Sequence, residues 1–463
     1  MPDRQRQLLV VANRLPIRAV TEHGETRYET SPGGLVSALG PVMSARPGST
    51  WVGWAGAPGD APAPFELDGV HLVPVALDPS DVEDYYEGFS NSTLWPLYHD
   101  AISPADYHRH WWDRYVVVNQ RFAHAVVDRA EIDATVWVHD YQLQLVPGML
   151  REMRPDLRIG FFLHIPFPAR EIFMRLPWRR QVAKGLLGAD LVGFQTRTTL
   201  HNFRHSVPRV CDATTHGSVI TYGSRDVATV RHPIGIDFDR FSDGASAPAA
   251  AERAETLLEN LGSPTTVLLG VDRLDYTKGI DRRLRAYHEL LQERRLDPET
   301  TTLVQIAEPS RSNVNRYNEI RVTVEQLVGE INGDFGTMDK PAVVYLHQSQ
   351  PFDELIALYR LADVMVVTPF RDGMNLVAKE YVAARVDNRG VLVLSEFAGA
   401  AHQLRQAVLV NPYDIDGVKG AIEAAATMPP AEQSSRMRPM RRLVRRTSAQ
   451  QWATSFLAEL ERT

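Results

Sequence analysis

Two segments in the second half of the chain place charged residues where an apolar strand runs into a helix. In VLLGVDRLDYTKGID, Arg273 and Lys278 lie five residues apart in the intervening loop. Cations at such a position could stabilise the charge that builds on a diphosphate leaving group, in place of a metal. The segment therefore predicts a diphosphate-binding loop, although a solvated cluster of charges is an alternative.

The second segment is RDGMNLVAKE (371–380), which follows the apolar run VMVVTPF. If its helix begins near Gly373, the first backbone N–H groups would face phosphate or sugar oxygens. Asp372 could accept hydrogen bonds from sugar hydroxyls, and Glu380 could accept them from two vicinal hydroxyls of a ribose. An ordinary helix capped by Asp372 is the alternative.

The first half of the chain offers weaker signals of the same kind. Arg14 follows the apolar run LLVVAN, and Gly33 and Gly34 open the helical pattern of SPGGLVSALGPVM. Glycines allow a ligand to approach the backbone, and a helix N-terminus favours an anion. Both features have structural alternatives, since turn glycines are common and Arg14 could form a salt bridge.

Sugar-binding candidates follow in the segment DYYEGFSNSTLWPLYHD (84–100), which is rich in aromatic and polar residues. Tyr and Trp rings bind the C–H faces of sugars, although an aromatic stripe more often belongs to the core. Asp140 in HDYQL and His164 in FFLHIPFP end two apolar runs. A lone histidine is usually structural, but His164 would share its strand edge with the other candidates.

Short apolar runs that alternate with amphipathic helical patterns must position these residues. The pattern predicts an α/β fold with parallel, doubly wound sheets. The strands restart after RHPIGIDFDRF (231–241). We therefore predict an N-terminal Rossmann-like domain (1–238), a C-terminal Rossmann-like domain (239–445) and a C-terminal helix (446–463) that could pack back on the first domain. Ligands bind at the carboxyl ends of such strands, so the cleft between the domains is the expected site.

Composition limits the classes of partner. The 463 residues are enough for two or three domains, and the net charge of −7 argues against nucleic acid as the main partner. The six arginines of 436–446 are explained by a solvated helix or by pairing with acids, rather than by binding to nucleic acid or membrane. No apolar run reaches about 18 residues, so we expect no membrane partner. The charged start, MPDRQRQ, leads us to expect a cytoplasmic protein.

The sequence also predicts neither a metal nor another cofactor. A single cysteine, Cys211, excludes an internal disulfide and a cysteine-based metal cage. The closest approach to a metal motif is Asp414-Ile415-Asp416, which follows Asn411-Pro412-Tyr413 and is typical of a turn.

Together these motifs resemble the trehalose-6-phosphate synthases, a family of retaining glycosyltransferases with the GT-B architecture of two Rossmann-like domains facing across a cleft. The resemblance covers about residues 7–460 and includes ANR, PGGL, GWAG, WVHDYQL, FFLHIPFP, VDRLDYTKGI and VTPFRDGMNLVAKEY. It implies transfer of glucose from a nucleotide diphosphate glucose to glucose 6-phosphate with retention, which gives α,α-trehalose 6-phosphate.

The resemblance also implies roles for individual residues. The catalytic residues would be His164, Arg273, Lys278 and Asp372. The donor would be bound by Gly33, Gly34, Arg273, Lys278, Gly373, Met374, Asn375, Leu376, Val377 and Glu380. The acceptor would be bound by Arg14, Trp54, Tyr86, Trp95, Asp140 and Arg311. Gln350 departs from the family, which often has an aromatic or apolar residue there, so the choice among UDP, GDP and ADP stays open. The oligomeric state stays open too, a homo-oligomer included.

The implied mechanism is front-face attack. A double displacement needs a carboxylate beneath the anomeric carbon, whereas the matching residue is His164. The departing diphosphate would then accept the proton of the acceptor. Two rivals are a pseudo-glycosyltransferase that joins a cyclitol to an amino-cyclitol phosphate, and a non-catalytic sensor of sugar phosphates. The intact HDYQL, VDRLDYTKGI and RDGMNLVAKE motifs favour the glycosyltransferase.

Overall fold

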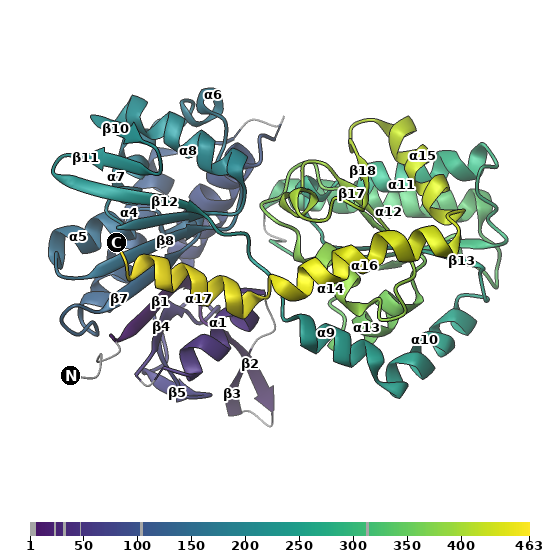
Figure 1. Ribbon diagram of the computed structural model, residues 1–463, viewed down its shortest axis with the longest axis horizontal. Coiled ribbons are helices and arrows are strands. Elements are labelled where there is room, and N and C mark those ends of the chain that lie inside the picture. Colours follow the sequence, from purple (N-terminus) through teal and green to yellow (C-terminus); the bar gives the residue numbers. More distant parts are fainter. Residues whose placement is uncertain (1–5, 23–24, 31–33, 47, 102–104, 312–313) are drawn as a thin grey trace. The chain divides into compact units, whose positions relative to one another are not determined.

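The computed structural model describes residues 6–463 except 23–24, 31–33, 47, 102–104 and 312–313. Two compact units are present (Figure 1). The first contains Met1–Ile234 together with Ala449–Thr463, and the second contains Gly235–Ser448. The chain therefore leaves the first unit once and returns to it with its last helix.

The first unit is built on a ten-stranded sheet in the order β10-β11-β12-β9-β8-β7-β1-β4-β6-β5. The seven strands from β12 to β6 pair in parallel, and antiparallel strands extend both edges. The strands are β1 (Leu8–Arg14), β4 (Thr50–Trp54), β5 (Phe65–Leu67), β6 (Val70–Pro74), β7 (Thr135–His139), β8 (Arg158–Leu163), β9 (Leu191–Phe194), β10 (Ala213–His216), β11 (Val219–Tyr222) and β12 (Arg225–Arg231). A separate hairpin joins β2 (Ile17–Glu22) to β3 (Glu25–Thr30).

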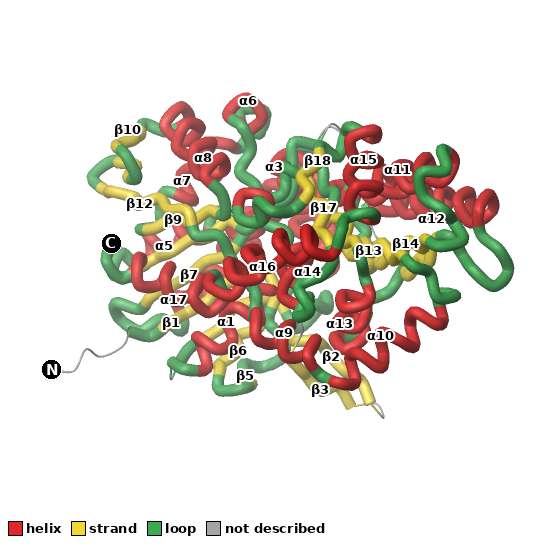
Figure 2. Tube along the Cα trace, turned by 45° about the vertical axis from the view of Figure 1, so that its right-hand side comes forward, coloured by secondary structure: helices red, strands yellow, loops and turns green. Residues whose placement is uncertain are grey.

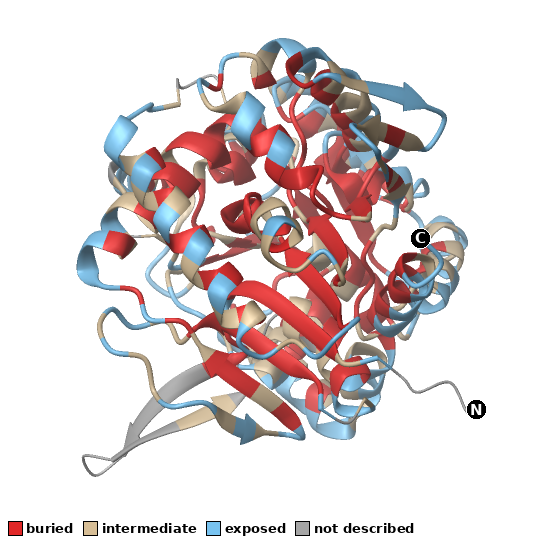
Figure 3. Ribbon diagram, turned by 90° about the vertical axis from the view of Figure 1, so that its left-hand side faces the viewer, coloured by how far each residue is buried: buried red, intermediate tan, exposed pale blue. Residues whose placement is uncertain are grey.

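The central strands of this sheet are buried almost throughout, as Figure 3 shows. Continuous rather than alternating apolar sequences are expected where helices cover both faces. The helical segments are α1 (Gly34–Ser44), α2 (Pro79–Asp81), η1 (Val82–Leu94), α3 (Trp95–Tyr98), α4 (Arg109–Val127), η2 (Tyr141–Leu143), α5 (Val146–Met153), α6 (Arg170–Phe173), α7 (Arg179–Leu186), α8 (Arg197–Val210) and α17 (Ala449–Leu460).

The aromatic segment of the first unit forms an unusual element. Residues Val82–Leu94 make a π-helix that leads directly into α3. The π-helix is rare and occurs mostly as a single turn, frequently at a functional site. Tyr85 and Phe89 are fully buried and pack with Tyr115 of α4, so the core alternative is right for them. Tyr86 instead meets the ring of Trp54, with 5.8 Å between the ring centroids.

The last helix, α17, packs on the sheet of the first unit. Phe456 stacks on Trp137 of β7 with 4.5 Å between ring centroids. Gly160 of β8 makes room for this helix, because a Cβ at that position would lie 2.8 Å from Leu460 Cδ2 and 3.0 Å from Phe456 Cε1. Close backbone approach therefore explains a glycine in the middle of a central strand.

The second unit is built on a six-stranded parallel sheet in the order β15-β14-β13-β16-β17-β18 (Figure 2). The strands are β13 (Thr266–Arg273), β14 (Thr301–Glu308), β15 (Val343–Leu346), β16 (Val364–Val367), β17 (Val391–Ser395) and β18 (Val408–Val410). The helical segments are α9 (Phe238–Ser246), α10 (Pro248–Asn260), η3 (Tyr276–Lys278), α11 (Ile280–Gln292), α12 (Asn315–Phe335), α13 (Phe352–Leu361), α14 (Leu376–Ala384), η4 (Gly399–His402), α15 (Ile415–Ala426) and α16 (Pro430–Arg446).

Strand order reverses between β13 and β16, which are neighbours in the sheet. The carboxyl ends of two strands at such a switch point are where α/β sheets bind ligands. The loops after β13 and β16 are the two segments that carry the predicted donor residues. The predicted α/β class with two mainly parallel sheets is confirmed.

One other interpretation of the sequence needs correction. Asp414 is the N-cap of α15 and accepts a hydrogen bond from Gly417 N at 3.0 Å, so the Asp-Ile-Asp motif begins a helix. The basic segment lies in α16, and Arg436 does pair with Glu432 at 2.9 Å. Arg441, however, donates to the carbonyls of Val382 and Ala383 near the end of α14. Unsatisfied carbonyls at a helix end explain this contact.

Candidate active site

The two charged loops of the second unit meet through one ion pair. Arg273 is the last residue of β13, and Lys278 ends the short helix η3 that follows. Lys278 Nζ lies 2.6 Å from Asp372 Oδ2, in the loop after β16. Both side chains are mostly buried, with 10% and 15% of their surfaces exposed. Three of the predicted catalytic residues thus lie on the loops at two neighbouring strand ends.

A second carboxylate, Asp275, organises the cations of the same loop. Its side chain is fully buried, and Oδ1 accepts hydrogen bonds from the backbone N and the hydroxyl of Thr277, both at 2.9 Å. Oδ2 lies 3.5 Å from Arg311 Nη1 and 4.0 Å from Arg273 Nη2. Burial favours the protonated form, but Arg311, Arg273 and Lys278 hold the pKa of Asp275 below its ordinary value. The site therefore holds three cations around two carboxylates.

The RDGMN loop differs from its predicted form. Helix α14 begins at Leu376, and its N-cap is Asn375, whose side chain accepts from Ala378 N at 3.0 Å. Asn375 has a φ of 77°, in the left-handed region that Asn tolerates better than most residues. Its Nδ2 also donates to Asp372 Oδ2 at 3.2 Å. The capped-helix alternative for Asp372 is therefore wrong, and Gly373 precedes the helix rather than opening it.

Close backbone packing fixes this loop. A Cβ on Gly399 would lie 2.0 Å from the carbonyl oxygen of Gly373. Ala400 N donates to Met374 O at 2.7 Å, and Gly399 N donates to Asp372 O at 3.1 Å. The start of η4, which follows the neighbouring strand β17, therefore holds Asp372, Gly373 and Met374 in place. Leu376 and Val377 form the first turn of α14.

Glu380 lies just over one turn into α14, not two turns as a start at Gly373 would require. Its Oε2 accepts a hydrogen bond from Tyr359 OH at 2.9 Å. Burial raises the pKa of Glu380 to about 7. The carboxylate can therefore gain or lose its charge near neutral pH. The neighbouring Lys379 is also buried, and burial lowers its pKa to about 7.

Arg283 contacts residues at or near the ends of three strands, and this role was not predicted from the sequence. It belongs to α11 and is 1% exposed. Its Nη1 donates to Asp272 Oδ2 at 2.7 Å and to Gln305 Oε1 at 2.8 Å, and Nε donates to Thr368 Oγ1 at 3.2 Å. One guanidinium thus ties together β13, β14 and the end of β16. A signal existed in Gly270, in the middle of β13, where a Cβ would lie 2.2 Å from Arg283 Nη1.

Three predicted acceptor residues come together in the first unit. Arg14 is exposed at the end of β1, and its guanidinium carbon lies 4.4 Å from the ring centroid of Trp54. Arg14 Nη1 also donates to Gly56 O at 3.4 Å. Trp54 in turn meets Tyr86 edge to face. A cation beside two aromatic faces can bind a sugar ring that carries a phosphate.

The remaining acceptor candidates have different settings. Trp95 is 4% exposed and packs against Tyr141, with 5.7 Å between ring centroids. Asp140 follows β7 with a φ of 73°, an unfavourable conformation for this residue type. Its Oδ1 accepts a hydrogen bond from His164 N at 3.1 Å, which links the ends of β7 and β8. Arg311 lies in the second unit, beside Asp275.

His164 lies at the end of β8 and is largely buried. Its Nε2 is 3.1 Å from Nδ1 of His139, which is fully buried at the end of β7. Burial lowers the pKa of His164 to about 3, so the ring is neutral at neutral pH. The structure gives little information on the two glycines predicted to bind the donor. Gly34 is the first residue of α1, and Gly33 lies outside the described residues.

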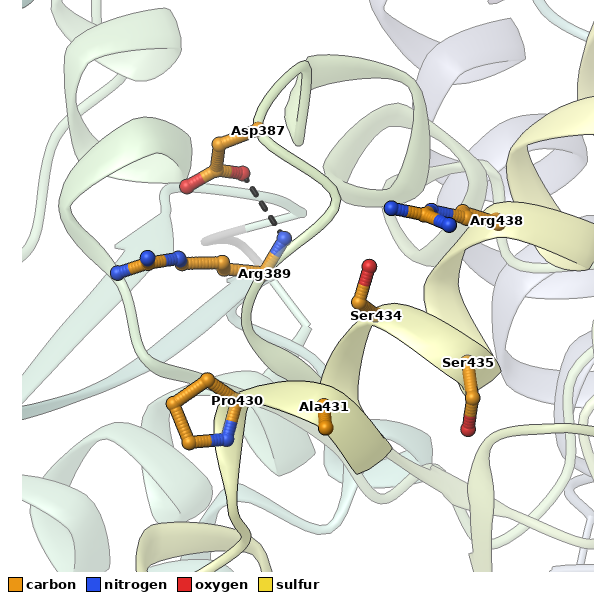
Figure 4. Close-up of a pocket in the computed structure, with 7 residues that line it drawn as sticks. All are labelled: Asp387, Arg389, Pro430, Ala431, Ser434, Ser435 and Arg438. Carbon is orange, nitrogen blue, oxygen red and sulfur yellow. Dashed lines mark hydrogen bonds between the residues drawn. The ribbon is translucent and has the colours of Figure 1, made fainter.

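One surface hollow of the second unit is lined by none of the predicted residues (Figure 4). It has a volume of about 520 Å³ and lies where α16 begins. Arg389 and Arg438 flank Ser434 there, and Asp387 accepts a hydrogen bond from Arg389 N. Across the described part of the chain, no three His, Cys, Asp or Glu side chains form a group that could hold a metal ion. Within the same residues, no helix is long and apolar enough to cross a membrane.

The chain is similar to known proteins in sequence and in fold. Residues 6–462 match the family described as glycosyltransferase family 20. The trehalose-6-phosphate synthase of Mycolicibacterium vanbaalenii is 54% identical over 468 residues, which cover 98% of this chain and 95% of that protein.

Solved structures are similar over the whole length. An α,α-trehalose-phosphate synthase (UDP-forming) from Burkholderia xenovorans, in complex with glucose 6-phosphate, matches with a TM-score of 0.90 and 36% identity, covering 98% of this chain and 100% of that one. A trehalose-6-phosphate synthase studied with bisubstrate glycomimetics, to understand glycosyl transfer with retention, matches with a TM-score of 0.89 and 35% identity over 99% of each chain.

Proposed function

The chain belongs to glycosyltransferase family 20, and we propose that it makes α,α-trehalose 6-phosphate from a nucleotide diphosphate glucose and glucose 6-phosphate. It transfers the glucosyl group to the anomeric hydroxyl of glucose 6-phosphate and retains the configuration of the transferred sugar. The observation that carries this function is the meeting of Lys278 with Asp372 at neighbouring strand ends, where a diphosphate sugar needs cations and a hydroxyl acceptor together.

The donor belongs to the second unit. Arg273 and Lys278 bind the diphosphate, and guanidinium and ammonium groups suit this task because charge grows on the leaving oxygen as the glycosidic bond breaks. Once phosphate oxygens take over Lys278, Asp372 is released to accept sugar hydroxyls. The loop from Gly373 to Val377 supplies backbone N–H groups. Glu380 accepts the two ribose hydroxyls.

The reaction proceeds by front-face attack. The acceptor hydroxyl approaches the anomeric carbon from the side on which the diphosphate leaves, and its proton passes to the departing phosphate oxygen. The anomeric carbon forms its bond to the acceptor oxygen as its bond to the phosphate oxygen breaks, and the nucleoside diphosphate leaves with the transferred proton. His164 is neutral and contributes through its position beside the reacting sugar. This proposal draws support from the low pKa of His164, which leaves the ring neutral.

Glucose 6-phosphate is bound by the acceptor residues of the first unit. Arg14 takes the phosphate, since a guanidinium forms paired hydrogen bonds with phosphate oxygens. Trp54 and Tyr86 present ring faces to the sugar, and Asp140 accepts a hydroxyl. Trp95 is buried and supports the acceptor site through its packing against Tyr141. The assignment of Arg311 to the acceptor stays a prediction.

Each substrate is assigned to one part of the chain. We assign acceptor binding to residues 1–238, donor binding to 239–445, and a supporting role to the helix of 446–463. Because both substrates carry ionised phosphates, which do not cross a bilayer unaided, we also propose that the enzyme acts in the cytoplasm. A homo-oligomer stays a prediction that sedimentation would check.

The deciding experiment is incubation with glucose 6-phosphate and UDP-, GDP- or ADP-glucose in turn. Nucleotide release that depends on glucose 6-phosphate, with a product carrying two α-anomeric protons by NMR, is the expected result. Release only with a cyclitol acceptor would favour the pseudo-glycosyltransferase. Binding of sugar phosphates with no release for any donor would favour the sensor. Either of these outcomes would overturn the proposed function.

A further inference from the structure

Four groups of the first unit form a continuous polar chain that ends at His139. The backbone N of Ile234 donates to Gln195 Oε1 at 2.8 Å. Gln195 Nε2 lies 3.5 Å from His164 Nδ1, and His164 Nε2 lies 3.1 Å from His139 Nδ1. Gln195 and His139 are 2% and 0% exposed, so water does not replace these contacts.

The orientation of the Gln195 amide follows from Ile234. A backbone N–H can only donate, so the oxygen of the amide must face it and the NH₂ group must face His164. His164 Nδ1 therefore meets a donor and has to be the nitrogen without a proton. At 3.5 Å the attraction itself is weak. The stronger effect is the repulsion between two N–H groups that the opposite tautomer would create in a buried place.

The position of the remaining protons follows. A neutral imidazole carries one proton, so that of His164 is on Nε2 and is donated to His139 Nδ1. His139 then carries its own proton on Nε2, a buried nitrogen that has no hydrogen-bond partner among the described residues. Burial lowers the pKa of His139 and His164, so both rings stay neutral at neutral pH. His139 lies against Trp137, with 4.6 Å between ring centroids, and α17 brings Trp452 to within 6.3 Å.

We propose that His139 and Gln195 are positioning residues that hold His164 as the Nε2–H tautomer. Both ring nitrogens of His164 are then engaged in contacts within the protein. His164 then serves the transfer reaction through the place of its ring and backbone, not through exchange of a proton. The relevance to turnover rests on the proposed function, in which His164 lies beside the reacting sugar. The tautomer itself does not depend on that function.

Side-chain NMR of the whole chain, labelled with ¹⁵N-histidine, tests this directly. His164 is assigned by the loss of its signals in His164→Asn. The expected pattern is a protonated Nε2 and an unprotonated Nδ1 at pH 7. The opposite pattern in the unsubstituted protein would overturn the proposal.

Two substitutions at position 139 separate hydrogen bonding from packing. His139→Asn places an amide oxygen near the former Nδ1 and keeps the acceptor, but it loses ring volume. His139→Phe keeps the ring and loses the acceptor. We expect both variants to keep the His164 pattern, because Gln195 still faces Nδ1. His139→Asn should also keep most of the turnover, whereas His139→Phe leaves the Nε2 proton without an acceptor and lowers turnover by about tenfold or more. The reverse order of the two variants would show that packing alone matters and would overturn the proposal.

Gln195→Glu provides a second measurement if either variant at position 139 folds poorly. The carboxylate keeps the shape and still accepts from Ile234 N, but it offers no N–H to His164. We expect the proton of His164 to move to Nδ1. An unchanged pattern would contradict the proposal. A changed pattern with unchanged turnover would support the tautomer assignment and overturn instead the placement of His164 at the reacting sugar.

Discussion

Replacing Asp372 by Asn should tighten the binding of a free nucleoside diphosphate while it lowers turnover. Asp372 Oδ2 lies 2.6 Å from Lys278 Nζ, so this carboxylate pairs with a cation that the diphosphate needs. A diphosphate that binds Lys278 must displace this carboxylate and then stays near its negative charge. Asn has nearly the same shape but no charge, so the diphosphate has no competitor. Turnover falls because an amide is a poorer acceptor for the hydroxyls of the donor sugar.

The size of the effect follows from the geometry. Unit charges separated by 2.6 Å attract by about 1.6 kcal/mol at the dielectric constant of water and by about 6 kcal/mol at an effective value of 20. Both side chains keep some exposure to solvent, so the lower figure is the safer guide. Since about 1.4 kcal/mol corresponds to a factor of ten, we expect the Kd of the nucleoside diphosphate to fall at least about tenfold.

Calorimetry with UDP and with GDP measures this change, and nucleotide release with the matching sugar nucleotide measures turnover. Asp387→Asn is a matched control. Asp387 also pairs with an arginine, Arg385, at 3.0 Å, but it lies on the surface away from the two charged loops. The control should bind the nucleotide as the unsubstituted protein does. A Kd that is unchanged or higher in Asp372→Asn would refute the reasoning that Lys278 binds the diphosphate.

Three further changes test other parts of the molecule. Arg273→Ala should lower turnover by about 10²–10³, as loss of one donor to a developing anion does; near-normal turnover would contradict its role. Donor affinity should rise as pH increases through about 7, because the pKa of Glu380 is raised and only its ionised form accepts both ribose hydroxyls; Glu380→Gln should abolish this pH dependence in binding assays. Gly160→Ala should lower the free energy of unfolding by about 1–3 kcal/mol, because its Cβ would collide with Leu460. Gly40→Ala, where a Cβ meets nothing within 4 Å, is the control in thermal denaturation.

Much of the fold was predictable because strands covered on both faces have continuous apolar sequences. The runs at 266–273 and 364–369 therefore marked β13 and β16, and parallel pairing brings their carboxyl ends to one edge. Arg273, Lys278 and Asp372 follow those ends directly. Sequence position alone was enough to bring them together.

Features that depend on register or on single dihedral angles were not predictable. The start of α14 depends on the left-handed Asn375, and residue type alone does not fix that conformation. Arg283 lies in an amphipathic helix, where a charged residue is expected at the surface. The contact of His139 with His164 depends on the pairing of β7 with β8, which aligns His139 with Phe162. None of these relations is visible within one segment of the sequence.

The missed residues share a physical property that bears on their role. Arg283 and Asp272 are 1% and 2% exposed and pair at 2.7 Å, yet a buried ion pair seldom stabilises a fold more than apolar side chains of the same size, because both charges lose their hydration. Stability is therefore a poor reason for this pair. Positioning of the strands is a better reason for this pair. A guanidinium with three fixed partners leaves the ends of β13, β14 and β16 little freedom to shift. Loops that must bring Arg273, Lys278 and Asp372 to one diphosphate need such a rigid base, because a displacement of about 1 Å can cost a hundredfold in rate.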